Sequence, residues 1–263
     1  MSNESVTSFF NRYHRHPSRI IEERMVTPAF DLDYIPAPTY ENKPTDIRIL
    51  LPESKKEWRV HSDVITGESN FFRMALAGPF LESRTKEIKL YEIDDKIMEF
   101  VVKYMYKGWS SAATSAFGLE DGAAVPPSEI AEILIAADFL DVPRLCYAAY
   151  HMMLRGMVSV VVLAKTESPY SHVSHRARQP FLRAAGVLEK SKTDVGIDLA
   201  GGIRMLMEKL RKAWDLDSAV KAFVDAFPTD HSLVNLELLW ESHGVVGSDG
   251  GGGVKAIWII WVD

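Results

Sequence analysis

One stretch, from Trp58 to Glu82, constrains the fold of this chain more than any other. Its sequence, WRVHSDVITGESNFFRMALAGPFLE, starts with the alternation that is typical of a strand. A first short helix is predicted from His61, closed by Gly67, because glycine commonly ends helices. Ser69 is placed to cap a second helix, which a Gly-Pro pair ends before a Phe-x-Glu loop. The stretch therefore predicts a strand, a helix pair and a loop in close succession.

Short strands and helices also flank this stretch on both sides. Residues 46–51 and 57–60 alternate apolar and polar side chains around a turn, which predicts a β-hairpin. Residues 87–90 predict a third strand, and residues 109–127, mostly small and polar, predict a long surface loop. Apolar stripes with their own start and stop signals predict helices over about 94–108, 128–137 and 141–156. Together these elements indicate an α+β fold with a small sheet and a mainly helical remainder.

The order of these signals resembles the BTB/POZ family of interaction domains, here a fungal-type chain with one such domain and a helical C-terminal region. The resemblance covers about residues 44–156. It implies a BTB/POZ fold, a small sheet capped by helical hairpins. The fold signature consists of His61, Ser69, Phe72, Tyr106 and Gly108. The other matching positions are Asp46, Ile47, Ile49, Val60, Phe80, Glu82, Ile88, Leu90, Tyr104, Ala137, Asp138, Leu140 and Leu145.

The chain departs from the family pattern in two places. Residues 109–127 stand where the family usually has a short link, so we expect an insertion there. Ser62 stands directly after the signature histidine, where the family often has lysine.

The resemblance implies a partner-binding role for the Phe-x-Glu motif, and with it a substrate adaptor for a cullin-based ubiquitin ligase. Members of the family that bind cullins use a hydrophobic-x-Glu motif after the second helix, and Phe80 and Glu82 match it in type and place. A loop phenylalanine can fill a pocket on a partner while a nearby carboxylate fixes the orientation. The alternative is that Phe80 packs under its own domain and Glu82 is solvated.

The resemblance also implies self-association into a homodimer. In the members that are transcription factors, an acidic residue at the first strand and an arginine before the histidine form a buried pair at the dimer seam. Asp46 and Arg59 supply both residue types here. The alternative is an exposed pair that contributes less than ~1 kcal/mol. The alternative function is accordingly a transcription-linked scaffold or corepressor-recruiting protein, for which the basic cluster of residues 12–19 would bind nucleic acid.

No catalytic constellation accompanies these motifs, so we expect a protein that is not an enzyme and needs no cofactor, metal or small-molecule substrate. The sequence contains no nucleophile elbow, nucleotide-binding glycine fingerprint or paired Cys/His set. His61 has no nucleophile or metal-ligand partner nearby, which favours a structural histidine at a strand–helix junction. The net charge of −6 argues against a general nucleic-acid binder.

Four segments are predicted along the chain. Residues 1–43 are punctuated by proline and serine and suggest a mobile arm, and residues 44–156 form the interaction domain. Residues 157–246 carry amphipathic stripes and predict a helical region, and residues 247–263 form a Gly-rich tail that we expect to be disordered. A single cysteine, Cys146, and the lack of an apolar run of ~20 residues predict a cytoplasmic or nuclear protein with no membrane span.

Overall fold

The computed structural model describes residues 43–119, 124–166, 175–191, 193–212 and 216–227. The chain divides into two compact units between Met152 and Met153. The predicted arm up to residue 42, with its basic cluster, and the predicted tail over 247–263 lie outside the described residues.

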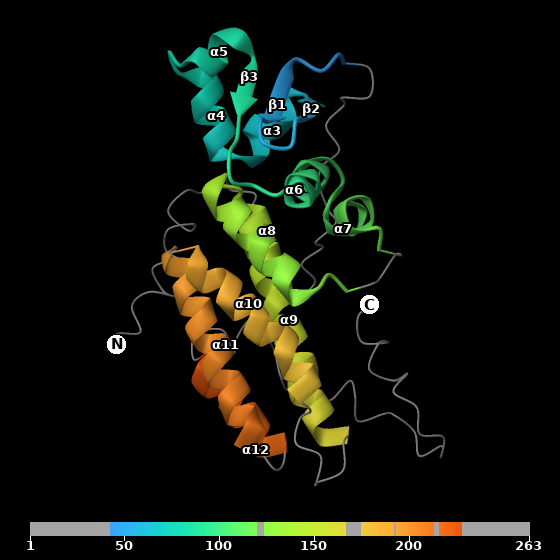
Figure 1. Ribbon diagram of the computed structural model, residues 1–263, viewed down its shortest axis with the longest axis vertical. Coiled ribbons are helices and arrows are strands. Elements are labelled where there is room, and N and C mark those ends of the chain that lie inside the picture. The colour runs from blue at the N-terminus through green and yellow to red at the C-terminus, as the bar shows by residue number, and fades with distance from the viewer. Residues whose placement is uncertain (1–42, 120–123, 167–174, 192, 213–215, 228–263) are drawn as a thin grey trace. The chain divides into compact units, whose positions relative to one another are not determined.

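The first unit contains a three-stranded sheet in the order β2-β1-β3 (Figure 1). Strand β1 (Ile47–Leu51) pairs antiparallel with β2 (Lys56–Val60) and parallel with β3 (Glu87–Lys89). Alternate side chains of β1, beginning at Ile47, are buried, because successive side chains of a strand point to opposite faces. The predicted hairpin and third strand are therefore confirmed.

A helix pair follows the hairpin and meets at Ser69. Helix α3 (Ser62–Glu68) contains Gly67, so the prediction that this glycine ends the helix is wrong. The N–H of Ser69 donates to the carbonyl of Ile65 at 2.9 Å. The helix therefore continues to Glu68, two residues beyond the predicted last residue, Thr66. Helix α4 (Asn70–Ala77) then begins, and the Ser69 hydroxyl accepts from the N–H of Phe72 at 3.1 Å. The predicted cap is confirmed.

The Ser69 side chain also connects elements that are far apart in the sequence. Its hydroxyl donates to the carbonyl of Leu140 at 2.6 Å, and the residue is only 1% exposed. Beside it, the N–H of Asn70 donates to the carbonyl of Asp141 at 3.0 Å. Two consecutive residues thus attach the start of α4 to the chain between the later helices α8 (Pro127–Phe139) and α9 (Pro143–Thr166).

The predicted Phe-x-Glu loop is partly helical. Helix α5 (Leu81–Thr85) begins directly after Phe80 and ends at Lys86, which adopts a left-handed conformation before β3. The loop prediction is wrong here, since a single helical turn places the motif at a helix start.

Helix α6 (Asp95–Lys107) has the predicted boundaries. The side chain of Asp94 accepts from the N–H of Lys96 at 2.8 Å, and Gly108 ends the helix with φ 81°. That φ lies in the region that favours glycine. The buried face of α6 includes Phe100 and Tyr104, two of the largest fully buried side chains in the described part of the chain.

The prediction of a surface loop over residues 109–127 is wrong for the first half of this range. Helix α7 (Trp109–Phe117) packs against α6, and Trp109 lies edge-on to the ring of Phe100 at 5.0 Å. The small residues here include buried Ala112 and Ala113, and alanine is the strongest helix former. The small side chains of this segment therefore allow α7 to pack closely against α6.

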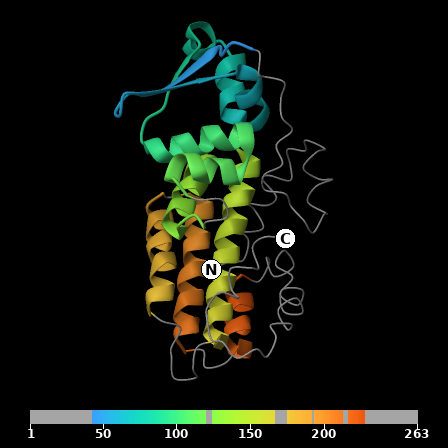
Figure 2. The same ribbon diagram turned by 90° about the vertical axis from the view of Figure 1, so that its right-hand side faces the viewer.

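The second unit is helical, with the later part of α9 followed by α10 (His175–Lys190), α11 (Asp194–Lys212) and α12 (Leu216–Ala226). Helix α11 packs against both α10 and α12, and the helices of this unit run roughly parallel to one another in the picture (Figure 2). The predicted helical region is confirmed over the described residues, and its buried stripe consists of Leu199, Ile203, Leu206, Met207, Leu210, Phe223 and Phe227. Residues 167–174, 192, 213–215 and 228–246 of the predicted helical region lie outside the described residues.

Replacing Ser69 with alanine is expected to lower the free energy of unfolding by about 1–3 kcal/mol. The change removes an N-cap and leaves the buried carbonyl of Leu140 without the Ser69 hydroxyl. Urea unfolding followed by circular dichroism measures the loss. Ser62→Ala is the matched control, because the Ser62 hydroxyl bonds at the surface. Equal losses in the two variants would contradict the importance given to Ser69.

Candidate protein-interaction site

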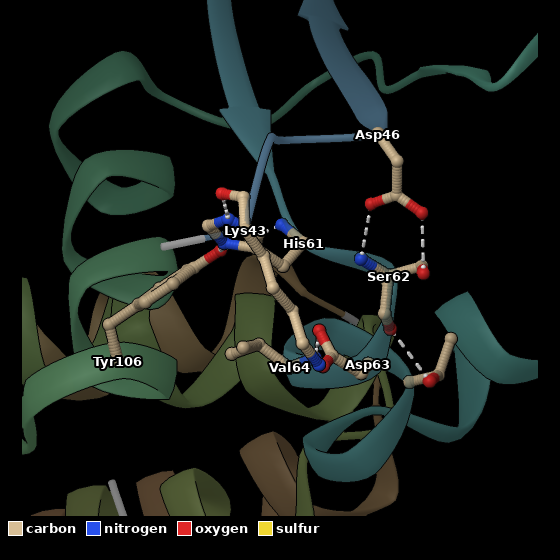
Figure 3. Close-up of polar contacts among 8 residues, drawn as sticks. Lys43, Asp46, His61, Ser62, Asp63, Val64 and Tyr106 are labelled. Atoms are coloured by element: carbon tan, nitrogen blue, oxygen red, sulfur yellow. Dashed lines mark hydrogen bonds and ion pairs between the residues drawn. The ribbon is translucent and has the colours of Figure 1, made fainter. Parts of the chain in front are cut away.

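A partly buried polar cluster forms where β2 leads into α3 (Figure 3). The hydroxyl of Tyr106 on α6 accepts from the backbone N–H of His61 at 2.8 Å and lies 2.9 Å from Nδ1 of the same residue. Nε2 of His61 lies 2.9 Å from the carbonyl oxygen of Lys43. One imidazole therefore connects the strand–helix junction, α6 and the chain before β1.

The partners of His61 assign its tautomer. A carbonyl oxygen only accepts, so Nε2 carries the hydrogen and donates to Lys43. Nδ1 then accepts from the hydroxyl of Tyr106, whose oxygen accepts from the His61 N–H. Both ring nitrogens are engaged in structural hydrogen bonds. The histidine holds elements together, as the sequence predicts.

Lys43 also bonds through its side chain, although the interaction domain was predicted to begin only at residue 44. Its ammonium donates to the carboxylate of Asp63 at 2.8 Å, and that hydrogen bond lowers the pKa of Asp63 below its usual value. Lys43 therefore contacts His61 at the β2–α3 junction through its backbone and α3 through its side chain.

Asp46, predicted at a dimer seam, bonds within its own chain to the start of α3 (Figure 3). Its carboxylate accepts from the N–H of Ser62 at 2.8 Å and from the Ser62 hydroxyl at 2.7 Å. Partial burial raises the pKa of Asp46, but the hydrogen bonds from Ser62 outweigh it and the pKa lies below its usual value. Ser62 stands where the family often has lysine. At the start of α3 its N–H and hydroxyl thus bond to Asp46, the residue directly before β1.

Arg59, the other residue predicted at the seam, is exposed on β2. Its Nε donates to the carboxylate of Glu57 at 2.8 Å. Within one chain, then, Asp46 and Arg59 each have another partner and the structure does not bring them together. Their pairing across a dimer seam stays a prediction.

The corner between α4 and α5 exposes the predicted partner-binding residues. The side chain of Phe80 is 53% exposed, and its ring lies over Gly78, where an added Cβ would approach the ring to 2.5 Å. Glycine at 78 therefore lets the ring fold back on its own backbone while its outer half faces solvent. The ring packs locally and also presents an apolar surface, and its partner-binding role stays a prediction.

Glu82 lies in the first turn of α5 and is half-buried. A carboxylate at this end of a helix is favoured by the positive end of the helix dipole. Among the described residues its carboxylate takes part in no ion pair.

Two further exposed apolar residues belong to the helices on either side of this corner and were missed by the motif. Leu81 is 70% exposed and Met74 on α4 is 64% exposed. The sequence did contain a signal for the exposure of Met74. Because Met74 follows the buried Phe72 by two residues on one helix, its side chain must face away from that ring. We call Met74, Phe80, Leu81 and Glu82 the corner patch.

The comparison with protein families fits this architecture. The BTB/POZ domain model matches residues 38–155. The chain is a BTB domain-containing protein. A comparison with curated proteins finds no significant match. BTB domains mediate protein–protein interactions, so the first unit is a protein-interaction module.

The signature residues of the BTB domain have structural roles in this chain. His61 and Tyr106 bond to each other, Ser69 caps α4, Phe72 is fully buried and Gly108 ends α6. None of these residues belongs to the corner patch. They hold the helix pair that carries the patch.

The described ranges contain no group of three or more His, Cys, Asp or Glu side chains that could hold a metal ion. No helix in the described part of the chain is long and apolar enough to cross a membrane.

The Asp46–Ser62 contact is expected to make stability depend on pH. Because the pKa of Asp46 in the folded state is lowered, its contribution is present above the usual aspartate pKa near ~3.9 and is lost as the pH falls through the folded value. Asp46→Asn should therefore lower the free energy of unfolding in urea at pH 7, by less than ~1 kcal/mol for a contact this exposed, and have a smaller effect at pH 3.

Glu53→Gln is the control, because it removes an exposed carboxylate elsewhere in the same unit. A difference between Asp46→Asn and wild type that stays constant from pH 7 to pH 3 would show that the ionised carboxylate contributes nothing.

Proposed function

We propose that this BTB protein is a non-enzymatic adaptor that self-associates and binds a cullin scaffold of a ubiquitin ligase through the corner patch. The observation that carries the proposal is the exposed ring of Phe80 directly before α5, with the carboxylate of Glu82 two residues on. This is the position and order of the hydrophobic-x-Glu motif of the family's cullin-binding members.

Apolar exposure supports a partner at this corner. Met74, Phe80 and Leu81 are all more than half exposed and belong to two adjacent elements. Clustered apolar exposure on a small domain commonly marks an interaction surface, whereas single exposed residues do not. A partner with an apolar pocket would cover these side chains and remove them from water.

Electrostatics supports the orientation of that partner. Glu82 adds a single negative charge beside the apolar residues, and a donor on the partner would fix the register of binding. An anchor that fills a pocket contributes most of the affinity in such interfaces, while a charge at the edge contributes mainly specificity. We therefore expect Phe80 to contribute more than Glu82.

Pull-down with a purified cullin N-terminal domain tests the proposal. Phe80→Ala is expected to weaken binding by about 2 kcal/mol, roughly 30-fold in Kd, because it removes the anchor. Glu82→Ala is expected to weaken it by a smaller factor. Titration with the same cullin domain, followed by calorimetry, gives the Kd of each variant.

Two matched controls accompany this comparison. Tyr91→Ala removes another exposed aromatic ring from the same unit, and Glu53→Ala removes another exposed carboxylate. Both controls should bind as wild type. Equal capture of wild type, Phe80→Ala and Glu82→Ala by the cullin domain would contradict the proposed binding mode.

Self-association is tested separately by analytical ultracentrifugation. Wild-type protein is expected to sediment as a dimer at micromolar concentration. Arg59→Glu is expected to shift it toward monomer, because Arg59 is mostly exposed and would face the partner's acidic residue. Lys89→Glu, the same charge reversal at an exposed site on β3, is the control. A wild-type monomer at all concentrations would remove the dimer from the proposal.

A further inference from the structure

The sheet of the first unit has an open edge along β2, which comes first in the strand order β2-β1-β3 (Figure 1). On β1, Arg48 and Leu50 form backbone hydrogen bonds of 2.9 Å with the residues that flank β3. The backbone groups of a strand alternate between its two neighbours, so Ile49, between Arg48 and Leu50, bonds toward β2. Trp58 lies opposite Ile49 and bonds back toward β1. The residues on either side of Trp58 therefore point their backbone groups away from the sheet.

These two outward residues are Glu57 and Arg59. In the part of the chain that the structure describes, their backbone N–H and C=O groups have no hydrogen-bond partner. Both side chains are exposed, and a free edge of this kind can accept a further strand. Charges on an edge strand usually hinder such pairing. Here the two charges have opposite signs, so they select a partner of matching charge.

The charges of this edge are complementary to those of a second copy of the chain. A two-fold axis places the two β2 strands antiparallel, with the same surface on both sides of the contact. The outward residues then lie opposite one another and exchange backbone hydrogen bonds. The possible registers put Glu57 opposite Glu57, Arg59 opposite Arg59, or each opposite the other. Like charges directly opposite are destabilising, so the register that pairs Glu57 with Arg59 and is centred on Trp58 is favoured.

The other side chains of β2 are compatible with this register. Lys56 belongs to a residue type that protects edges, but an ion pair of 3.3 Å with Asp95 draws it toward α6. The indole of Trp58 donates to Glu99 of α6 at 2.7 Å and is half-buried. On the two-fold axis, its remaining surface would lie opposite Trp58 of the second copy. Aromatic pairs across antiparallel strands are stabilising.

We propose that two copies of this chain pair antiparallel along β2 and join their sheets into one continuous sheet. Glu57 of each copy faces Arg59 of the other, and both pairs add backbone hydrogen bonds. The inference rests on the proposed self-association and specifies its surface. It makes Glu57 the acidic residue that Arg59 meets across the dimer, in place of Asp46, whose carboxylate already bonds to Ser62 in its own chain.

An extended peptide of another protein is a less suited occupant of this edge. Such a peptide could also add a strand and form the backbone hydrogen bonds. It would need an acidic and a basic side chain two residues apart to match Glu57 and Arg59. A second copy supplies both by symmetry, with an aromatic ring between them.

Charge reversal tests the pairing by analytical ultracentrifugation of the full chain. Glu57→Arg and Arg59→Glu each place like charges opposite one another at both pairs, so each variant alone is expected to dimerise about 10-fold more weakly or worse. An equimolar mixture should regain dimers close to the wild-type affinity, because one chain then carries two arginines and the other two glutamates. Glu92→Arg, the same reversal at an exposed site outside the strands, is the control.

Disulfide formation tests the register independently of charge. Opposite residues of a non-hydrogen-bonded antiparallel pair have Cα atoms ~4.5 Å apart, a distance that a disulfide spans. Trp58→Cys is therefore expected to form an interchain disulfide under mild oxidation, and native Cys146 is buried. The control is Lys56→Cys, because position 56 lies opposite Val60 of the second copy. The two thiols at 56 would be about 14 Å apart and should react at least 10-fold less.

The outcomes separate this inference from self-association itself. A wild-type monomer at all concentrations would overturn both. A wild-type dimer that Glu57→Arg leaves unchanged would overturn the β2 pairing alone, since a seam between Asp46 and Arg59 does not involve Glu57. So would a mixture of the two charge variants that stays monomeric while circular dichroism shows both folded, or equal crosslinking at positions 56 and 58.

Discussion

The BTB domain of this chain depends on the two hydrogen bonds of one buried hydroxyl. Ser69 accepts from the N–H of Phe72 and donates to the carbonyl of Leu140, 71 residues further along the chain. A buried hydroxyl that lost either partner would leave a polar group without water, at a cost of about 1–3 kcal/mol. Ser69 therefore fixes where α4 begins and which later turn it meets.

The position of the corner patch follows from this attachment. With its first turn fixed at Ser69, α4 buries Phe72 and turns Met74 outward. Gly78 then ends the helix and leaves room for the ring of Phe80. On the other side, His61 and Tyr106 secure the start of α3. The corner patch is thus carried by a helix pair that is held at both ends.

The sequence predicted those features of the fold that local chemistry decides. Ser69, Asp94 and Gly108 are capping residues whose role needs no distant partner, and each was placed correctly. Helix α7 was missed because Ala112 and Ala113 pack closely on α6 without the apolar contrast that reveals an amphipathic helix. The motif indicated Phe80 and Glu82, but the exposure of Leu81 depends on tertiary packing, which no local pattern encodes.

We propose that the corner patch is the surface that contacts a cullin. Methyl NMR of the full chain, labelled at methionine and leucine methyl groups, tests this contact during titration with a cullin N-terminal domain. The signals of exposed Met74 and Leu81 are expected to shift or broaden first, while that of Met98 in the core of the same unit stays in place. Shifts confined to other surfaces, with Met74 and Leu81 unchanged at saturation, would contradict it.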